Sequence, residues 1–302
     1  MSRGEALVPR DWLDWISRLP ADGGPTGAAW ARRAPLLVRE VVEEWGLLVA
    51  GPASTGWTAV VLPVEQDGEP LALKVGWPNR ESAAEPLALR HWGGRGAVRL
   101  VAADPGRGAL LLERLDPGRT LASVPDDEAA AVIGGLLGRL HVPAPPRVRT
   151  LPAFLDEQLG RMRARTDLPR RIVARVDSLA ADLLGGPGAA DTLLHTDLHH
   201  GNVLGGAREP WLAIDPKPMA GHPGWEFQPL LRNRVQELGT GSAFRWSVRR
   251  RLEVAADAAG MEEDLARAWT LVHTGVECLW AAEDGDAAAL TLHIALLKAL
   301  AD

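Results

Sequence analysis

The chain has 302 residues and is poor in several residue types that would assign it to a class of protein. Its single cysteine cannot form an internal disulfide, which predicts a reducing compartment, the cytoplasm. No uncharged apolar stretch reaches the ~18 residues that a membrane-spanning helix needs. The start, MSRGEALVPRDWLDW, carries acids and tryptophans where a signal peptide would be apolar. We therefore expect a cytoplasmic protein that does not span a membrane.

An excess of positive charge is also lacking. Lysine and arginine together number 33 against 39 aspartates and glutamates, so the formal net charge is −6. Proteins that bind nucleic acid neutralise phosphates with basic side chains, which makes that class a poor fit. A cationic small molecule is a better partner for an acidic protein. With 46% hydrophobic residues the chain can form one large or two closely packed domains, and we expect a monomer or a weak dimer.

Lysine is the scarcest charged residue, with three lysines against thirty arginines. Lys74 lies in the apolar segment LALKV, where a compact ammonium would suit the α- and β-phosphate oxygens of a nucleotide. A surface lysine on a strand edge is the alternative. Glu81 and Glu85 follow at helical spacing, and either could pair with Lys74. Pro86 predicts a helix that either begins near Glu85 or is kinked there.

The first part of the chain has the pattern of a small β-rich lobe. Helical periodicity in residues 11–45 is broken by 20–27 and predicts helices that pack on this lobe. Five apolar segments then predict strands, with a hairpin turn at Asp67-Gly68; they are 47–50, 57–64, 70–75, 97–101 and 109–113. The small-residue loop Gly51–Gly56 could approach phosphates, although an ordinary hairpin turn is equally consistent with it.

After the last of these strands the pattern changes. The segment LLERLDPGRT predicts a crossover, in which the backbone of Glu113–Leu115 could bind a purine edge. From Asp126 onward helical stripes dominate, and Asp126 and Asp127 are candidate N-caps. Further helices are predicted after Pro152, around 172–183, and at 243–259, 261–282 and 286–301. Strands followed by helices predict an α+β, two-lobe fold, with an N-lobe at 1–115 and a C-lobe at 116–302.

The most informative stretch is LLHTDLHHGNVLGGAREPWLAIDP, residues 193–216, which has the pattern of a β-hairpin preceded by a loop. Such a hairpin would gather Asp197, Asn202 and Asp215 at one end. One carboxylate, Asp197, could orient and deprotonate an attacking hydroxyl, while Asn202 and Asp215 hold Mg²⁺ against nucleotide phosphates. Polar residues that merely form a loop are the alternative interpretation.

Three histidines in the same stretch, His195, His199 and His200, raise the possibility of a zinc site. Zinc would need further histidine or cysteine donors downstream, and those that follow lie in unrelated contexts. We expect His195 to pack behind the loop and to bond to the backbone, which would orient Asp197.

The motifs HTDLHHGN, the IDP at Asp215, ALKV and LLERL together resemble those of the aminoglycoside phosphotransferases, which have the protein-kinase-like fold. Within that family the chain is most similar to the streptomycin 6-kinases, also called aminoglycoside/hydroxyurea resistance kinases, over roughly residues 45–300. The resemblance implies transfer of the ATP γ-phosphoryl group to a hydroxyl group of an antibiotic, foremost the 6-hydroxyl of streptomycin, with Mg²⁺ as cofactor and resistance as the result.

The resemblance also implies roles for single residues. Asp197 takes the position of the catalytic base, and Asn202 and Asp215 take those of the Mg²⁺ ligands. Lys74 takes the phosphate-binding position, and Glu85 rather than Glu81 that of its partner. Gly56 and Thr58 fall in the loop that contacts the phosphates. The backbone around Glu113 and Leu115 takes the position of the adenine-binding hinge. Two positions depart from the family: Glu226 stands where relatives usually carry aspartate, and Pro86 interrupts the helix.

For the acceptor, the two guanidinium groups of streptomycin call for carboxylates. Asp197, Glu226 and Glu277 are the candidates, and Trp280 could stack on a guanidinium; core packing is the alternative for Trp280. Two other functions stay open. One is a kinase of the same fold that acts on hydroxyurea or an amino sugar, and the other is a nucleotide-binding scaffold without catalysis.

Overall fold

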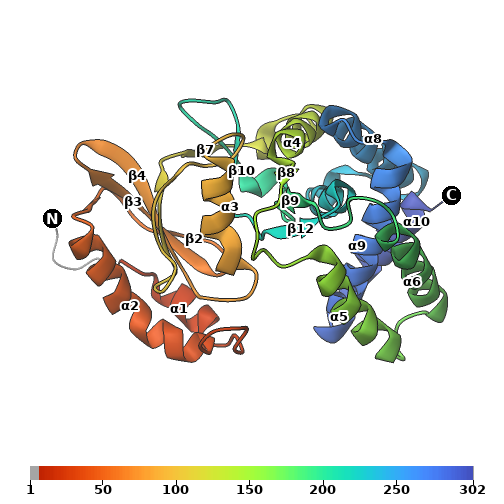
Figure 1. Ribbon diagram of the computed structural model, residues 1–302, viewed down its shortest axis with the longest axis horizontal. Coiled ribbons are helices and arrows are strands. Elements are labelled where there is room, and N and C mark those ends of the chain that lie inside the picture. Colours follow the sequence, from red (N-terminus) through yellow and green to blue (C-terminus); the bar gives the residue numbers. More distant parts are fainter. Residues whose placement is uncertain (1–6, 302) are drawn as a thin grey trace. The chain divides into compact units, whose positions relative to one another are not determined.

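A computed structural model describes residues 7–301 and divides the chain into two compact units (Figure 1). The first, which we call the sheet unit, runs to Asp116 and includes Gly206–Arg208. The second, the helical unit, comprises residues 117–205 and 209–301 of the described chain. In the described residues no helix is both long and apolar enough to span a membrane.

The sheet unit is built on a six-stranded sheet of order β1-β3-β4-β6-β5, with β2 paired to β3. The pairings are antiparallel, and Val60, Leu62 and Val64 of β3 are fully buried at alternate positions, as expected of a strand with one covered face. The strands are β1 (Leu48–Val49), β2 (Ser54–Thr55), β3 (Ala59–Gln66), β4 (Glu69–Gly76), β5 (Leu100–Asp104) and β6 (Ala109–Glu113).

The strand predictions for this unit are confirmed in type and corrected in detail. Asp67 and Gly68 have φ angles of 51° and 82° and turn β3 into β4, the two positive values that a type I′ hairpin requires. The fourth predicted strand begins later, at Leu100 instead of residue 97, because 93–96 still belongs to the turn after helix α3. The short strand β2 was not predicted, because its two exposed residues lack an apolar pattern.

Two helices, α1 (Arg10–Ile16) and α2 (Gly27–Glu44), cover the sheet (Figure 1). They share one hydrophobic cluster with β3 and β4, to which Trp12, Ile16 and Trp30 contribute buried side chains. The start of α2 is capped by Thr26, whose hydroxyl accepts the N–H of Ala29 at 3.2 Å. The expectation that the N-terminal helices pack on this lobe is therefore confirmed.

The third helix, α3, spans Glu85–Trp92, so it begins at Glu85 and is not kinked there. Pro86 lies in its first turn, where a missing N–H removes no helical hydrogen bond. Its last turn ends at Gly93, whose φ of 58° is the left-handed conformation that glycine adopts without strain. Of the two alternatives left by the sequence, the structure shows the first.

The helical unit contains the longer helices and two small three-stranded sheets, β11-β10-β7 and β12-β9-β8. Its helices are α4 (Asp126–Leu140), α5 (Leu151–Ala164), α6 (Arg170–Leu184), α7 (Gln228–Arg232), α8 (Gly241–Ala259), α9 (Glu263–Glu283) and α10 (Ala287–Leu300). Its strands are β7 (Asp116–Thr120), β8 (Val142–Pro143), β9 (Thr192–Leu194), β10 (Val203–Gly205), β11 (Leu212–Ala213) and β12 (Met219–Gly221).

Helix α9 is central to this unit, because α5, α6, α8 and α10 all pack on it. Twelve of its residues are buried, and Trp269, Val272 and Val276 belong to the hydrophobic cluster of this unit. The start of α4 corrects a prediction. The helix begins at Asp126 after Pro125, and neither Asp126 nor Asp127 caps it by a side-chain hydrogen bond. Asp126 instead forms an ion pair with the fully buried Arg251 at 2.7 Å.

Candidate functional site

The residues expected to carry chemistry in the helical unit lie on the loop that leaves β9 and on the hairpin of β10 and β11. Val203 pairs with Ala213 across this hairpin, and Ile214 N–H donates to Asn202 O at 2.9 Å. This register brings Asn202 and the start of the segment after β11 to the same end of the hairpin. The hairpin predicted from the sequence is therefore confirmed.

Asp197 and Asn202 are tied together within the loop. The Asn202 Nδ2 donates to the backbone oxygen of Asp197 at 2.8 Å, and it lies 3.5 Å from Asp197 Oδ2. Asp197 is only 7% exposed. The preceding residue, Thr196, has a φ of 62°, an unfavourable conformation for a β-branched residue that surrounding contacts must maintain. This strain marks the loop as a structure that the rest of the unit holds in place.

Glu226 supplies part of that support. Its carboxylate accepts the N–H of His195 at 2.6 Å and that of Thr196 at 2.7 Å. The side chain is fully buried, and burial raises the pKa of Glu226 to about 7 although the two N–H donors oppose the shift. We expected Glu226 to contact a cationic substrate; instead both of its oxygens bind backbone N–H groups of the loop that carries Asp197. The carboxylate reaches that backbone from the segment Pro223–Phe227.

His195 holds the loop from within. Its ring is fully buried, with Nε2 3.0 Å from Ile214 O, while Nδ1 accepts the N–H of Asp197 at 3.3 Å. Burial lowers the pKa of His195 to about 4, so the ring is neutral at pH 7. The expected backbone-bonding function of His195 is confirmed. Among residues 7–301, no group of three or more histidine, cysteine or acidic side chains is placed to hold a metal ion.

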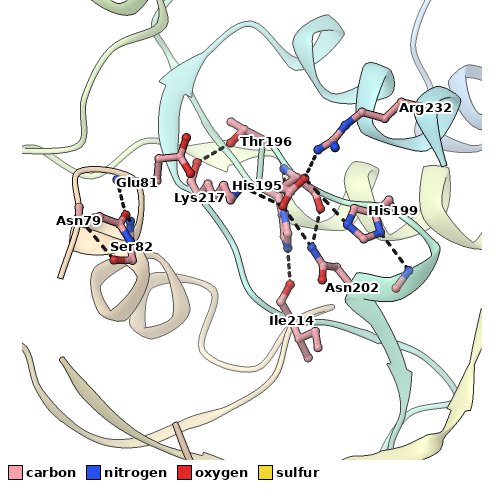
Figure 2. A network of polar contacts seen from close by, with 12 residues as sticks. Asn79, Glu81, Ser82, His195, Thr196, His199, Asn202, Ile214, Lys217 and Arg232 are labelled. Atoms are coloured by element: carbon pink, nitrogen blue, oxygen red, sulfur yellow. Dashed lines mark hydrogen bonds and ion pairs between the residues drawn. The ribbon is translucent and has the colours of Figure 1, made fainter. Parts of the chain in front are cut away.

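Two cations contact the carboxylate of Asp197 (Figure 2). Arg232, at the end of α7, donates from Nη2 to Oδ1 at 2.7 Å, and the Lys217 Nζ lies 3.3 Å from Oδ2. His199 adds an Nε2 at 4.0 Å from Oδ1, and burial lowers its pKa. Sequence analysis missed both cations. For Lys217 the signal was available, because a rare lysine follows the IDP motif directly, whereas nothing local pointed to Arg232.

The predicted Mg²⁺ ligands fit an ion that prefers oxygen donors. Asn202 uses its Nδ2 for Asp197 O, which leaves its Oδ1 as the ligand atom. Asp215 follows Ile214, the residue bonded to Asn202, and has a φ of 56°, a conformation that aspartate tolerates better than most residues. One amide and one carboxylate suit Mg²⁺, which keeps water and phosphate ligands in its shell. Their function as ligands stays a prediction.

In the sheet unit, Lys74 and Glu85 form a buried ion pair. The Lys74 Nζ donates to Oε1 and Oε2 of Glu85 at 2.6 and 2.7 Å, and the two residues are 9% and 3% exposed. Lys74 lies on β4 in the middle of the sheet, and Glu85 is the first residue of α3. The pair therefore fixes the helix against the strand and sets the direction of the lysine side chain.

The loop before β3 is a short hairpin held by α1. The N–H of Gly56 donates to Ala59 O at 2.8 Å, so this amide is used within the turn. Trp12 Nε1 donates to Gly56 O at 2.9 Å, and Trp15 Nε1 donates to Trp57 O at 3.2 Å. The carbonyl of Thr58, the other predicted residue of the loop, accepts the N–H of Trp77 at 2.8 Å. Phosphate contact by Gly56 and Thr58 stays a prediction.

The predicted hinge residues follow β6. The carboxylate of Glu113 binds Arg208 at distances of 2.8–3.1 Å and accepts the N–H of Arg99 at 2.7 Å. Leu115 is buried, at 8% exposure. Any contact of this segment with a purine would therefore use the backbone, as the sequence suggested, because the Glu113 side chain is engaged within the sheet unit.

The last two candidates, Glu277 and Trp280, lie on α9. Glu277 has Arg232 Nε at 3.5 Å from Oε1 and His293 Nε2 at 3.6 Å from Oε2, so Arg232 bridges Glu277 and Asp197. Trp280 donates from Nε1 to Gln158 at 3.0 Å and meets Phe154 edge to face at 6.1 Å. These are contacts of a packed side chain, and stacking of Trp280 on a ligand stays a prediction.

Comparisons with known proteins match most of the chain. The family model for the aminoglycoside/hydroxyurea antibiotic resistance kinases matches residues 44–285. A hydroxyurea phosphotransferase of Kitasatospora aureofaciens is 44% identical over 319 residues, which cover 97% of this chain and 90% of the relative. A streptomycin 6-kinase of Streptomyces glaucescens is 42% identical over 285 residues, which cover 92% of each chain.

Solved structures of low sequence identity share the fold. One is a thermostable mutant of aminoglycoside phosphotransferase APH(4)-Ia in a ternary complex with ADP and hygromycin B. It superimposes with a TM-score of 0.54 at 16% identity and covers 87% of this chain and 98% of its own. The predicted α+β fold of the protein-kinase-like type, with a β-rich first part and a mainly helical second part, is confirmed.

Proposed function

The chain belongs to the aminoglycoside/hydroxyurea antibiotic resistance kinases, and we propose on that premise that it transfers the γ-phosphoryl group of ATP to the 6-hydroxyl of streptomycin. The observation that carries this proposal is the loop 195–202, which holds Asp197 beside Asn202 at the end of a hairpin that also carries Asp215. Phosphorylation of the antibiotic would confer resistance.

In the reaction we propose, the acceptor oxygen attacks the γ-phosphorus while the bond from that phosphorus to the β,γ-bridging oxygen breaks, and ADP leaves. Asp197 aligns the hydroxyl and receives its proton late in the step. The rate then comes chiefly from positioning, which explains why so many contacts fix the Asp197 loop. His195 and Glu226 hold the backbone on either side of Thr196, and Arg232 holds one carboxylate oxygen.

For the nucleotide, we propose that Lys74 contacts the α- and β-phosphates and that Glu85 keeps its ammonium in place. Gly56 and Thr58 would lie along the phosphates, and the backbone of Glu113 and Leu115 would meet the purine. ADP is bound in the related fold described above. Mg²⁺, held by Asn202 and Asp215, would supply positive charge to the phosphate oxygens. Use of ATP is consistent with a cytoplasmic protein.

Charge favours a cationic acceptor. Glu277 remains the better carboxylate for a guanidinium group of streptomycin, because Glu226 is buried against the loop. Glu277 already binds a guanidinium, that of Arg232, at 3.5 Å. A second candidate acceptor is hydroxyurea, which the relative at 44% identity favours. Hydroxyurea is small and uncharged, so it would need the Asp197 loop but not Glu277.

The test is ADP release by the purified protein with MgATP and streptomycin, hydroxyurea, an amino sugar or no acceptor. Release with streptomycin above the level of an Asp197→Asn variant supports the first proposal. Release with hydroxyurea alone moves the assignment to the second. Release with none of them, by a protein that binds AMP-PNP, would leave a nucleotide-binding scaffold as the function. A Glu277→Gln variant sharpens the choice, because it should raise the KM for streptomycin more than the KM for hydroxyurea.

A further inference from the structure

We propose that Lys217 is a further catalytic residue, whose ammonium contacts the γ-phosphoryl group as it passes from ATP to the acceptor. This inference rests on the proposed function and adds a second phosphate-binding lysine to it, in the helical unit. Neither the catalytic motif nor the predicted metal ligands include this residue.

The backbone of Lys217 is fastened to the catalytic loop from both sides. Its N–H donates to His195 O at 2.9 Å, and its carbonyl accepts the hydroxyl of Thr196 at 2.5 Å. Lys217 therefore keeps a fixed position relative to Asp197, although it lies on the segment after the hairpin. Figure 2 shows its side chain extending toward the loop, from the side opposite Arg232. The ammonium ends 3.3 Å from Asp197 Oδ2.

The two cations at Asp197 differ in a way that assigns them different tasks. Arg232 makes the shorter contact, 2.7 Å, and its planar guanidinium also reaches Glu277, so it fixes one carboxylate relative to another. Lys217 makes a longer contact on a flexible stem, and its side chain is 39% exposed against 11% for Lys74. A compact ammonium in this setting can shift from a carboxylate to a phosphoryl oxygen by a small rotation.

The charge changes of the reaction favour such a shift. When the acceptor oxygen bonds to phosphorus, the hydroxyl proton moves to Asp197, and Asp197 loses its negative charge. The negative charge of the transferred phosphoryl group remains beside it and attracts the ammonium that the carboxylate no longer binds. The step moves one proton, from the hydroxyl to Asp197, and needs no further proton or electron. The same ion pair thus holds Lys217 near the reacting atoms before transfer and releases it toward the phosphate during transfer.

Composition supports the choice of lysine over arginine. The chain uses arginine for thirty of its 33 basic residues, so a generic positive charge in this protein is an arginine. Of the three lysines, Lys74 forms the buried ion pair and Lys217 contacts Asp197, while Lys298 is exposed on α10. Two of three lysines therefore lie at residues proposed to handle phosphate, where a compact ammonium is chemically distinct from a guanidinium fork.

The first test separates turnover from nucleotide affinity. Lys217→Met should lower kcat with the accepted substrate by about 10²-fold, while the KM for ATP changes by less than about threefold. Lys217→Arg should recover less than about a tenth of the lost rate, because the guanidinium is wider and its contacts are planar. Lys298→Met is the matched control and should leave both constants unchanged. A kcat of Lys217→Met near that of the wild type, or full recovery with Lys217→Arg, would overturn the proposal.

The second test does not need a known acceptor. Titration calorimetry of ADP with Mg²⁺, with and without aluminium fluoride as a mimic of the phosphoryl group in transfer, compares ligands that differ in that group. Lys217→Met should lower the affinity ratio, with against without aluminium fluoride, by about threefold or more relative to the wild type, with ADP affinity retained as proof of a folded site. An unchanged ratio would contradict the contact. If the wild type turns over no acceptor, the proposed function fails, and this ratio alone decides the assignment of Lys217.

Discussion

The two groups of charges proposed to act on one nucleotide are built differently. In the sheet unit, Lys74 and Glu85 are 11 residues apart in sequence and form a buried pair with two contacts of 2.6–2.7 Å. In the helical unit, the buried Asp197 meets a cation that is 35 residues away, and its loop is held by a glutamate about as distant. The first group joins residues close together in the sequence, whereas the second is assembled from several elements.

The difference indicates which charges can move. A buried ion pair is costly to break, because each charge left alone in the interior keeps its desolvation penalty. Lys74 should therefore act as a fixed positive charge. The cations on Asp197 are about one third exposed, with side-chain values of 35% for Arg232 and 39% for Lys217, so solvent compensates them when contacts change. We infer that changes in the sheet unit alter nucleotide binding and that changes in the helical unit alter turnover.

The largest expected effect comes from Asp197 itself. Asp197→Asn keeps the shape of the side chain but removes its negative charge and its capacity to take a proton. We expect kcat to fall by about 10²- to 10³-fold with little change in the KM for ATP. Asp182→Asn on the exposed face of α6 is the control. A steady-state assay in which Asp197→Asn keeps its turnover would remove Asp197 as the base and break the comparison.

The second largest effect is expected when the buried pair of Lys74 and Glu85 is broken. Lys74→Met should raise the KM for ATP by about tenfold or more and lower the free energy of unfolding by about 3 kcal/mol, since Glu85 is left buried without its cation. In the double variant Lys74→Met/Glu85→Leu the stability should return while ATP binding does not. Denaturant titrations and ATP kinetics on the three proteins measure both. If the double variant also regained ATP affinity, Lys74 would not be a phosphate ligand.

The third effect is a pH dependence of the stability that Glu226 contributes beneath the Asp197 loop. Burial raises the pKa of Glu226 to about 7 from an ordinary value of 4.5, so the folded protein binds this proton more tightly than the unfolded chain does. The stability from this group is complete below pH 4.5 and is lost as the pH rises through 7. Between pH 4.5 and 8 the wild type should lose on the order of 3 kcal/mol relative to Glu226→Gln.

Chemical denaturation at pH 5 and pH 8 measures that difference. Subtracting the unfolding free energy of Glu226→Gln from that of the wild type removes the contribution of the buried histidines. Their lowered pKa values reduce stability as the pH falls below 6.5, which is the opposite direction. Glu263→Gln, at an exposed position of α9, should follow the wild type at both pH values. A constant difference between the wild type and Glu226→Gln would show that Glu226 keeps the same charge in the folded and unfolded states.

The smallest effect concerns the loop before β3. Trp12→Phe removes the indole N–H that binds Gly56 O at 2.9 Å and keeps an aromatic ring in the core. We expect a loss of about 1 kcal/mol in stability and a rise of about threefold in the KM for ATP, with kcat unchanged. Trp246→Phe, at a residue that is 67% exposed, is the control. A change in kcat would contradict the division between binding and turnover.

The contrast between the two groups also explains how far the sequence could be interpreted. The strands of the sheet unit that were predicted, the helix at Glu85 and the hairpin 193–216 follow from local signals. The pairing of Lys74 with Glu85 does so too, because the two residues are only 11 positions apart. The contacts of Glu226 and Arg232 span more than 30 residues, which a local pattern does not contain. Glu226 was expected to face a ligand because an acid at a family motif suggests a site, whereas its burial is set by tertiary packing.

The central claim is that Asp197 activates an acceptor hydroxyl for direct transfer from ATP. It is tested most directly by following the label of γ-labelled ATP in the presence of streptomycin or hydroxyurea. We predict that the label appears in the acceptor, one for each ADP formed, and that Asp197→Asn abolishes this transfer. Label recovered only as inorganic phosphate, or bound to the protein itself, would contradict the account.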